Sequence, residues 1–294
     1  MSKRKKIALK PLDALVLMGL AAAAAWLTYR AQATLDYDWN WEVIPQYLLR
    51  HDRESGWVAG LLVQGLLTTL RIAVWTMVLA LVFGTAAGMM RAGRSLFGRM
   101  TSRAYVECVR NTPPIVLVFL FYFFIGDQIM SAVGLDELVR GLPAPAREFM
   151  GTFMAEPRYF AGFISAVLTL ALYEGAYITE IVRSGIQSIE KGQREAAETL
   201  GLSRIQTMRH VILPQALRRI LPPLAGQFIS TVKDSSIVSV ISIQELTFQG
   251  MELMAATYLT FEIWITVVVL YLTLTLTLSF LARGLESRLA AGSA

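Results

Sequence analysis

Residues 195–214 read Glu-Ala-Ala-Glu-Thr-Leu-Gly-Leu-Ser-Arg-Ile-Gln-Thr-Met-Arg-His-Val-Ile-Leu-Pro, a polar and helix-forming stretch between two long apolar segments. Ala196, Ala197 and Leu200 recur at helical spacing. Two of these three side chains are methyl groups, so another surface can approach this face closely. Gly201 follows at a position where a left-handed helix cap is expected.

A second short helix is expected directly after this glycine. Ser203 and Gln206 have the spacing of a capping box at its start, and Pro214 is expected to mark its end. The stretch therefore predicts two helices joined at a glycine, with a contact face of small residues, projecting from a membrane domain.

The rest of the chain is strongly apolar. Of its 294 residues, 55% are hydrophobic, and the mean hydropathy is +0.51. Several apolar runs reach the ~20 residues that cross a bilayer, which predicts an all-α integral membrane protein. About six transmembrane helices are expected, at about Pro11–Tyr29, Trp57–Met90, Pro113–Val133, Tyr159–Val182, Leu221–Ile243 and Tyr258–Leu281.

The net charge of +5 is distributed unevenly along the chain. Loops rich in Lys and Arg face the cytoplasm, and an even number of spans places both termini there. This pattern favours a membrane over a nucleic-acid partner. The cations of the expected cytoplasmic segments are Lys3, Arg4, Lys5, Lys6, Lys10, Arg91, Arg94, Arg99, Arg103, Arg183, Lys191, Arg194, Arg204, Arg209, Arg218, Arg219, Arg283 and Arg288. The opposite loops hold acids, among them Asp38, Glu42, Glu137, Glu148 and Glu156.

Three regions are expected along the chain. Residues 1–57 predict an N-terminal transmembrane helix and an external loop. Their basic start and alanine run also fit a signal peptide, but Trp26 and Tyr29 as interface anchors favour a retained helix. Residues 58–285 predict the main membrane domain, with a cytoplasmic segment at about 183–219, and residues 286–294 a cytoplasmic tail.

Ionisable side chains inside apolar segments are expensive and are candidates for function. Lys233 and Asp234 are adjacent, so on a regular helix they point about 100° apart. Either each meets a partner on another helix, or the backbone is irregular beside a water-filled cavity. A translocation path and a brace between helices both remain open. The path candidates are Lys233, Asp234, Ser235, Ser236, Glu174 and Arg71.

Two ion pairs are expected near the cytoplasmic boundary. Glu107 with Arg110, and Glu180 with Arg183, have helical i, i+3 spacing. A structural role is favoured for both. Arg110 has Glu180 on another helix as an alternative partner.

Catalytic chemistry has little support in the sequence. His51, His210 and Cys108 form neither a metal cluster nor a Cys-His pair, and Gly-Lys-Ser and Gly-Lys-Thr do not occur. The interpretation is a transport protein without a catalytic site, a metal or a cofactor of its own. Cys108 is expected to be a buried small hydrophobe.

A family resemblance rests on residues 195–214 and two further motifs. Glu195, Ala196, Ala197, Gly201, Val211, Leu213 and Pro214 give Glu-Ala-Ala, three residues, Gly, nine residues, an aliphatic residue, one residue, Leu-Pro. This pattern resembles the coupling helix (the EAA loop) of permease subunits of binding-protein-dependent ABC importers. Arg110-Asn-Thr-Pro113 and Gly175-Ala-Tyr-Ile-Thr-Glu-Ile-Val-Arg183 resemble the polar amino-acid permease subfamily, with similarity over about residues 58–285.

The resemblance implies a multi-pass permease of the bacterial inner membrane that translocates a polar amino acid. It implies an external substrate-binding protein, a second permease subunit, identical or paralogous, and separate ATPase subunits that use ATP and Mg. The coupling loop would dock in a groove of the ATPase. The alternative is an ion-coupled secondary transporter that uses Glu174 or Asp234.

Overall fold

The computed structural model describes residues 11–34, 37–53 and 56–291, and the contacts of the chain separate two units, Met1–Trp41 and Glu42–Ala294. The first unit contains helix α1 (Pro11–Thr34) and the stacked rings of Trp39 and Trp41, whose centroids are 6.1 Å apart. Two sets of expected cytoplasmic residues lie outside the described residues, namely Lys3, Arg4, Lys5, Lys6, Lys10 and residues 292–294 of the tail.

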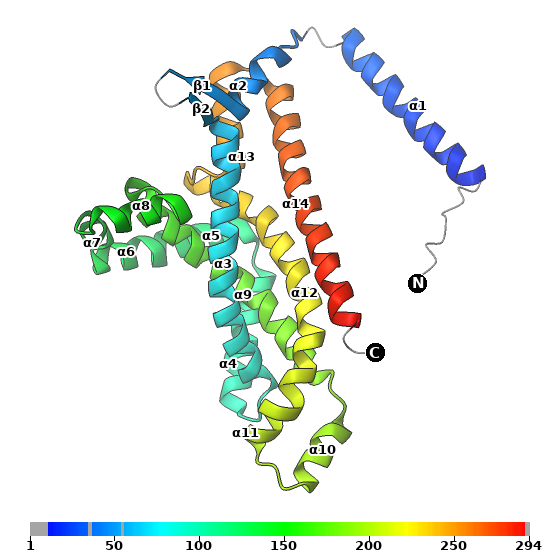
Figure 1. Cartoon of the computed structure of the whole chain (residues 1–294), viewed down its shortest axis with the longest axis vertical. Coiled ribbons are helices and arrows are strands. Elements are labelled where there is room, and N and C mark those ends of the chain that lie inside the picture. Colours follow the sequence, from blue (N-terminus) through cyan, green and yellow to red (C-terminus); the bar gives the residue numbers. More distant parts are fainter. Residues whose placement is uncertain (1–10, 35–36, 54–55, 292–294) are drawn as a thin grey trace. The chain divides into compact units, whose positions relative to one another are not determined.

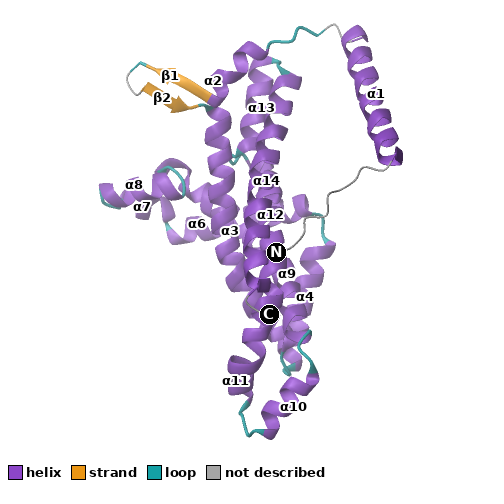
Figure 2. Ribbon diagram, turned by 45° about the vertical axis from the view of Figure 1, so that its right-hand side comes forward, coloured by secondary structure: helices purple, strands orange, loops and turns teal. Residues whose placement is uncertain are grey.

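The second unit is helical apart from one hairpin, which Figure 2 shows in orange. Strands β1 (Leu49–Asp52) and β2 (Gly56–Ala59) pair antiparallel, so Trp57 lies in a strand and not in the expected membrane helix. The other elements (Figure 1) are η1 (Trp41–Val43), α2 (Ile44–Leu48), α3 (Leu61–Ala92), α4 (Leu96–Asn111), α5 (Pro114–Leu120), η2 (Phe121–Gly126), α6 (Asp127–Val133), α7 (Leu135–Arg140), α8 (Ala144–Phe153), η3 (Pro157–Tyr159), α9 (Phe160–Gln187), α10 (Lys191–Thr199), α11 (Arg204–Gln206), η4 (Thr207–Ile212), α12 (Leu213–Asp234), η5 (Ser235–Ile241), α13 (Leu246–Thr257) and α14 (Thr260–Ala291).

Helices α3 and α9 form the central contact of this unit. A Cβ at Gly84 would lie 2.6 Å from the Ile178 side chain, and one at Gly88 2.7 Å from that of Val182. Both partners advance by four residues, so the helices run in the same direction. The Gly-xxx-Gly pattern therefore packs helices within the chain.

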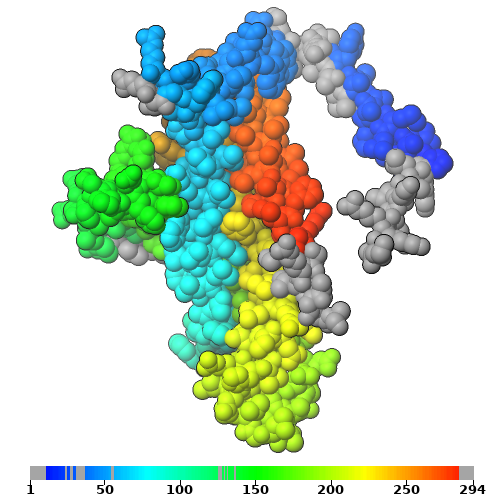
Figure 3. Space-filling model, in the orientation of Figure 1, coloured from blue at the N-terminus to red at the C-terminus, as the bar shows by residue number. Residues whose placement is uncertain are grey.

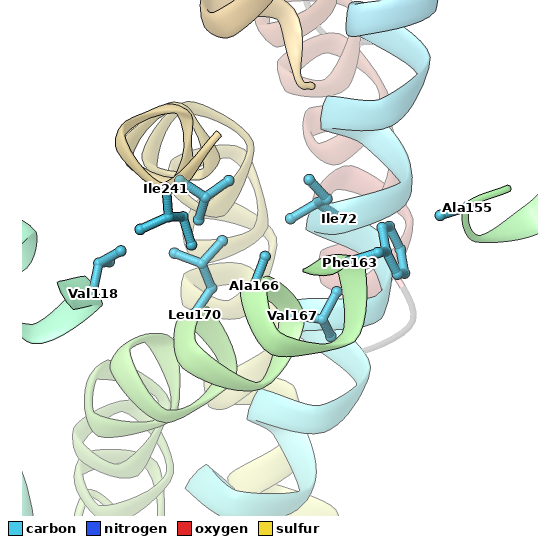
Figure 4. Close-up of a cluster of buried hydrophobic side chains, with 9 residues drawn as sticks. Ile72, Val118, Ala155, Phe163, Ala166, Val167, Leu170 and Ile241 are labelled. Carbon is cyan, nitrogen blue, oxygen red and sulfur yellow. The ribbon is translucent and has the colours of Figure 1, made fainter. Parts of the chain in front are cut away.

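An apolar cluster lies where α3 and α9 meet the end of α12. Ile72, Phe163 and Leu170 are buried there, and Ile241 reaches the same cluster from η5 (Figure 4). Because these side chains come from three segments far apart in the sequence, the cluster fixes the position of η5 against α3 and α9.

Three described helices are long and apolar enough to cross a membrane, Leu61–Ala92, Pro157–Gln187 and Thr260–Gly284. A bent pair, Leu96–Asn111 with Pro114–Phe124, would make a fourth, and Pro11–Ala23 is a shorter apolar helix. The all-α membrane fold is thus confirmed. The count of six spans and the cytoplasmic placement of both termini stay predictions.

The expected span at Pro113–Val133 consists of α5, η2 and α6, and a sharp bend precedes it. The chain bends by 114° between α4 and α5. A residue that precedes proline is disfavoured in the helical region, and Thr112 and Pro113 each precede one. Both are accordingly extended, with ψ angles of 137° and 133°.

The sequence predicts that Pro214 ends a helix, and this prediction is wrong. Pro214 lies in the first turn of α12, which continues directly from the π-helical segment η4. The wider turn of a π-helical segment is a common position for a proline within a helical run. The helix then passes through Pro222 and Pro223, so it begins well before the expected Leu221.

Candidate functional site

The coupling segment, residues 191–214, contains the predicted glycine cap. Gly201 has φ +75°, in the left-handed region. The amide of Leu202 donates to the carbonyl of Ala197 at 3.1 Å, which closes the helix end in the manner of a Schellman motif. The left-handed cap after α10 is therefore confirmed.

The capping box of the next helix is also present. The Ser203 amide donates to Gln206 Oε1 at 2.8 Å, and the Gln206 amide donates to Ser203 Oγ at 3.4 Å. The chain thus leaves one helix and enters the next within four residues, with backbone groups satisfied on both sides.

The exposed face of this segment differs from the one that the sequence predicts. Ala197 is buried, because α10 packs against η4, whereas Ala196 and Glu195 are exposed. Leu200 and Ile205 flank the glycine turn and are each 80% exposed. In Figure 3 this yellow-green segment forms the lower end of the second unit. The apolar contact surface is therefore the tip of the turn.

One polar contact joins α10 to α12, and a second joins the end of α9 to α12. Gln215 Nε2 donates to Gln193 Oε1 at 3.2 Å, and Arg219 donates to the carbonyl of Ser188. The motif residues Leu213 and Pro214 form the first turn of α12, half-buried and exposed respectively. The coupling segment is therefore continuous with α12 along the chain and also contacts it through side chains.

A buried polar cluster lies between α9 and α12. Glu174 is fully buried about halfway along α9, and its Oε2 accepts a hydrogen bond from Gln227 Nε2 at 2.6 Å. Thr231 and Asp234 also interact with this carboxyl group. Residues 227, 231 and 234 share one face of α12 because they follow i, i+4, i+7 spacing. The structure therefore brings Glu174 and Asp234 together.

The other path candidates lie elsewhere. Lys233 is exposed, so it does not share the environment of Asp234, and the backbone changes from α to 3₁₀ geometry directly after Asp234. Ser235 is buried, and its hydroxyl donates to the carbonyl of Val232 at 2.8 Å, whereas Ser236 is half-buried. Of the two expected alternatives, the partner on another helix is present for Asp234 only, and the backbone irregularity directly follows it.

Arg71 lies in neither group. It is half-buried on α3, 20 residues before Arg91 (91 − 71), which corresponds to about 30 Å of helix. That length equals the ~30 Å hydrocarbon thickness of a bilayer. Arg71 therefore lies near one edge of the apolar stretch of α3 and not at its middle.

The ion pairs near the other end of α3 are partly as expected. Arg183 Nη2 lies 2.8 Å from Glu180 Oε2, and Arg91 of α3 also pairs with Glu180. The predicted pair between Glu107 and Arg110 does not form. Glu107 Oε1 instead pairs with Nε of Arg103, one helical turn earlier, at 2.7 Å.

Arg110 stacks over the Tyr177 ring, with its guanidinium carbon 5.1 Å from the centroid. It therefore makes neither of its two expected ion pairs. Cys108 is exposed and not buried, since its face of α4 is uncovered within this chain.

Two polar residues of the fold, Gln227 and Glu245, were not predicted from the sequence. Gln227 was detectable, since it precedes Asp234 by seven residues on one helix face. Glu245 had no local signal. It is fully buried, caps α13 through the amide of Phe248 at 2.8 Å, and accepts a hydrogen bond from Tyr271 at 2.7 Å.

Comparisons with known proteins agree with this arrangement. The family described as "Binding-protein-dependent transport system inner membrane component" matches residues 80–291. The glutamine transport system permease protein GlnP of Escherichia coli (strain K12) is 37% identical over 257 residues, which cover 87% of this chain and 99% of that protein. The probable glutamine ABC transporter permease protein GlnM of Bacillus subtilis (strain 168) is 34% identical, with 76% and 91% covered.

Solved structures show the same fold. A structure of an amino acid ABC transporter with histidines superimposes with a TM-score of 0.61 at 32% identity, over 78% of this chain and 94% of that chain. An inward-facing MetNI methionine ABC transporter gives a TM-score of 0.59 at 21% identity, over 78% and 96%, and supports the fold alone.

The fold and the coupling segment define a multi-pass membrane transport subunit. The chain belongs to the family of inner-membrane components of binding-protein-dependent transport systems, as a permease subunit of an ABC importer. The resemblance inferred from residues 195–214 is confirmed, and the secondary-transporter alternative is not favoured.

Proposed function

We propose that this permease passes a polar amino acid, with glutamine as the first candidate, across a bacterial inner membrane. A soluble binding protein would deliver the substrate from outside. Separate subunits would hydrolyse ATP with Mg, and a second permease, identical or paralogous, would complete the path. The names of its relatives support the substrate class.

The observation that carries the proposal is the tip of the coupling segment. Leu200 and Ile205 expose apolar side chains on the two sides of the turn. The Gly201 cap and the Ser203 capping box fix the backbone of this turn. Exposed apolar groups rimmed by polar residues are typical of protein contact sites. A groove on the ATPase would cover them, and contacts from α10 to α12 would carry its movement into the membrane.

The polar cluster of Glu174, Gln227 and Asp234 is the proposed path through this subunit. It offers carboxyl and amide groups at mid-span, where an amino acid needs hydrogen-bond partners in place of water. The same carboxyl groups are what an ion-coupled secondary transporter would use.

Uptake by proteoliposomes separates these functions. The permease is reconstituted with its ATPase and a binding protein, and labelled L-glutamine is supplied with internal ATP. Uptake that needs ATP and the binding protein supports the proposal. Uptake by the permease alone under a proton gradient would support the secondary transporter instead.

A further inference from the structure

A cavity of about 480 Å³ lies at the opposite end of α3 from the coupling segment. Its walls come from α3, from the start of α9 and from the turn between η5 and α13. This volume falls within the ~300–1,000 Å³ of small-molecule sites. The polar side chains used below are those of Gln64, Thr68, Arg71, Glu156, Arg158 and Gln249.

Arg71 is the uncommitted cation of this cavity. Gln64, Thr68 and Arg71 lie on one face of α3 and all line it. Among the described residues, none forms an ion pair or hydrogen bond with the Arg71 guanidinium, although this side chain is half-buried. Arg158, at the rim, pairs with Glu156 at 2.9 Å and is exposed. Arg71 is therefore free to bind an anion.

Gln249 supplies a second unsatisfied group in the same wall. Its side chain is 5% exposed, and no described residue donates a hydrogen bond to its Oε1. The side chain packs closely against α3 at Gly65, where a Cβ would lie 2.9 Å from Gln249 Cγ. A buried acceptor without a donor is destabilising, so a donor from a ligand would stabilise this arrangement.

We infer that this cavity is an outer binding site for a free amino acid, separate from the Glu174 cluster. Arg71 binds the α-carboxylate, and Gln249 Oε1 accepts an N–H of the ligand. Guanidinium groups match carboxylates in geometry and charge. The second cation of the lining, Arg158, is paired with Glu156, so Arg71 is left with one uncompensated charge, which suits a singly charged carboxylate better than a phosphate. The inference rests on the proposed function, because it takes the cargo to be an amino acid.

Protection of an introduced thiol tests this site without transport. The full-length chain carries Cys108→Ser and Thr68→Cys, and right-side-out membrane vesicles are treated with an impermeant maleimide without ATP or binding protein. L-Glutamine should slow the labelling at position 68. Its α-amide, which lacks the carboxylate, should not. Arg50→Cys, on the exposed hairpin, is the control that L-glutamine should leave unprotected.

Two matched variants assign the effect to Arg71. Arg71→Gln should raise the half-protecting L-glutamine concentration about tenfold or more, as expected for loss of a charge-assisted contact. Arg147→Gln, which removes an exposed cation outside the cavity lining, should change it less than twofold. Equal labelling at position 50 in the two variants shows that the fold is retained. The comparison of L-glutamine with its α-amide needs no variant at Arg71.

The outcomes separate the two proposals. If L-glutamine gives no protection, the outer site is refuted even where ATP-driven uptake is normal. If inorganic phosphate or vesicles rich in phosphatidylglycerol protect and L-glutamine does not, the cavity binds a phosphate or a lipid headgroup and the inference is wrong. Protection by L-glutamine in a protein without ATP-driven uptake would refute the proposed function and leave the amino-acid site standing.

Discussion

Gly201 has a backbone conformation that residues with a side chain rarely adopt. Its φ is +75°, but a Cβ there would meet no atom within 4 Å. A substitution therefore acts through the backbone and through any surface that docks on the turn, and not through a clash inside the chain. For an ordinary L-residue the left-handed region costs ~1–2 kcal/mol.

Gly201→Asp should abolish ATP-driven uptake and release the ATPase during purification, while the permease stays in the membrane. Gly201→Asn is the matched control, since asparagine tolerates this conformation better than other side chains. It should retain more ATPase than Gly201→Asp. If Gly201→Asp transports normally, this turn does not couple the subunits.

Asp234 and Lys233 belong to different environments, so their substitutions should differ. Asp234→Asn alters the cluster with Glu174 and should reduce uptake at least tenfold with the complex still assembled. Lys233→Met, at an exposed position, should reduce uptake only if Lys233 faces the path in the complete transporter. Arg218→Gln, exposed on the same helix, should leave uptake unchanged.

Thermal unfolding of the purified complex separates a path from a brace. A charge without a partner at this depth costs about 3 kcal/mol, so Asp234 needs a compensating role. If the Asp234→Asn complex melts earlier and its remaining folded fraction transports at the normal rate, Asp234 is a brace and the path assignment is wrong.

At the scale of single residues, contacts between sequence neighbours were predictable, and contacts between residues far apart in the sequence were not. The Gly201 cap and the Ser203 capping box depend on neighbours within a few residues, and the sequence predicted both. The partner of Glu107 depended on a choice between two arginines at nearly equal spacing. Gln227, which lies 53 residues from Glu174, required the packing of α9 on α12.

Among the elements, the α3–α9 contact depends most on side-chain size. Gly84→Ala would place a methyl group 2.6 Å from the Ile178 side chain. Overpacking typically costs about 1–3 kcal/mol, so this variant should lower the thermal midpoint of the purified permease. Gly226→Ala, in a helix with no atom within 4 Å of the new methyl, should leave the midpoint unchanged or raise it. Equal midpoints for the two variants would contradict this close packing.

The elements also show where proline rules succeed and fail. Thr112-Pro-Pro114 breaks a helix, because two successive residues are each followed by proline. Pro214, Pro222 and Pro223 lie within one helical run. Pro214 directly follows the π-helical segment η4, where the helix is already irregular. Contacts of α12 with α9 and α14 stabilise the helix at Pro222 and Pro223. Such contacts cannot be predicted from the local sequence.

In the whole molecule, the hairpin and the coupling segment lie at opposite ends of the second unit (Figure 1). The charge pattern predicts that the coupling segment is cytoplasmic. In a Cys108→Ser background, Arg50→Cys should react with an impermeant thiol reagent added to intact cells, and Lys191→Cys should react only after lysis. Both positions are exposed. The reverse labelling pattern would show that the orientation is inverted.

Hydropathy predicted the membrane fold but not its full geometry. Uniformly apolar stretches such as α3 and α14 are evident from composition. The bend between α4 and α5 and the start of α12 before Leu221 were not predicted, since they depend on neighbouring helices and not on hydropathy. The cavity beside Arg71 joins residues from 64 to 249, so only the assembled fold reveals it.

The helical run from Arg204 to Asp234 has one further consequence. All of it is described, and α11, η4 and α12 follow one another without an intervening loop. Its 31 residues (234 − 204 + 1) correspond to about 45 Å of continuous helix. No loop interrupts this run, so the coupling segment and Asp234 are joined by helical backbone alone. In an importer whose ATPase moves the coupling segment, that movement would reach Asp234 along this backbone, so the release of cargo would follow ATP hydrolysis.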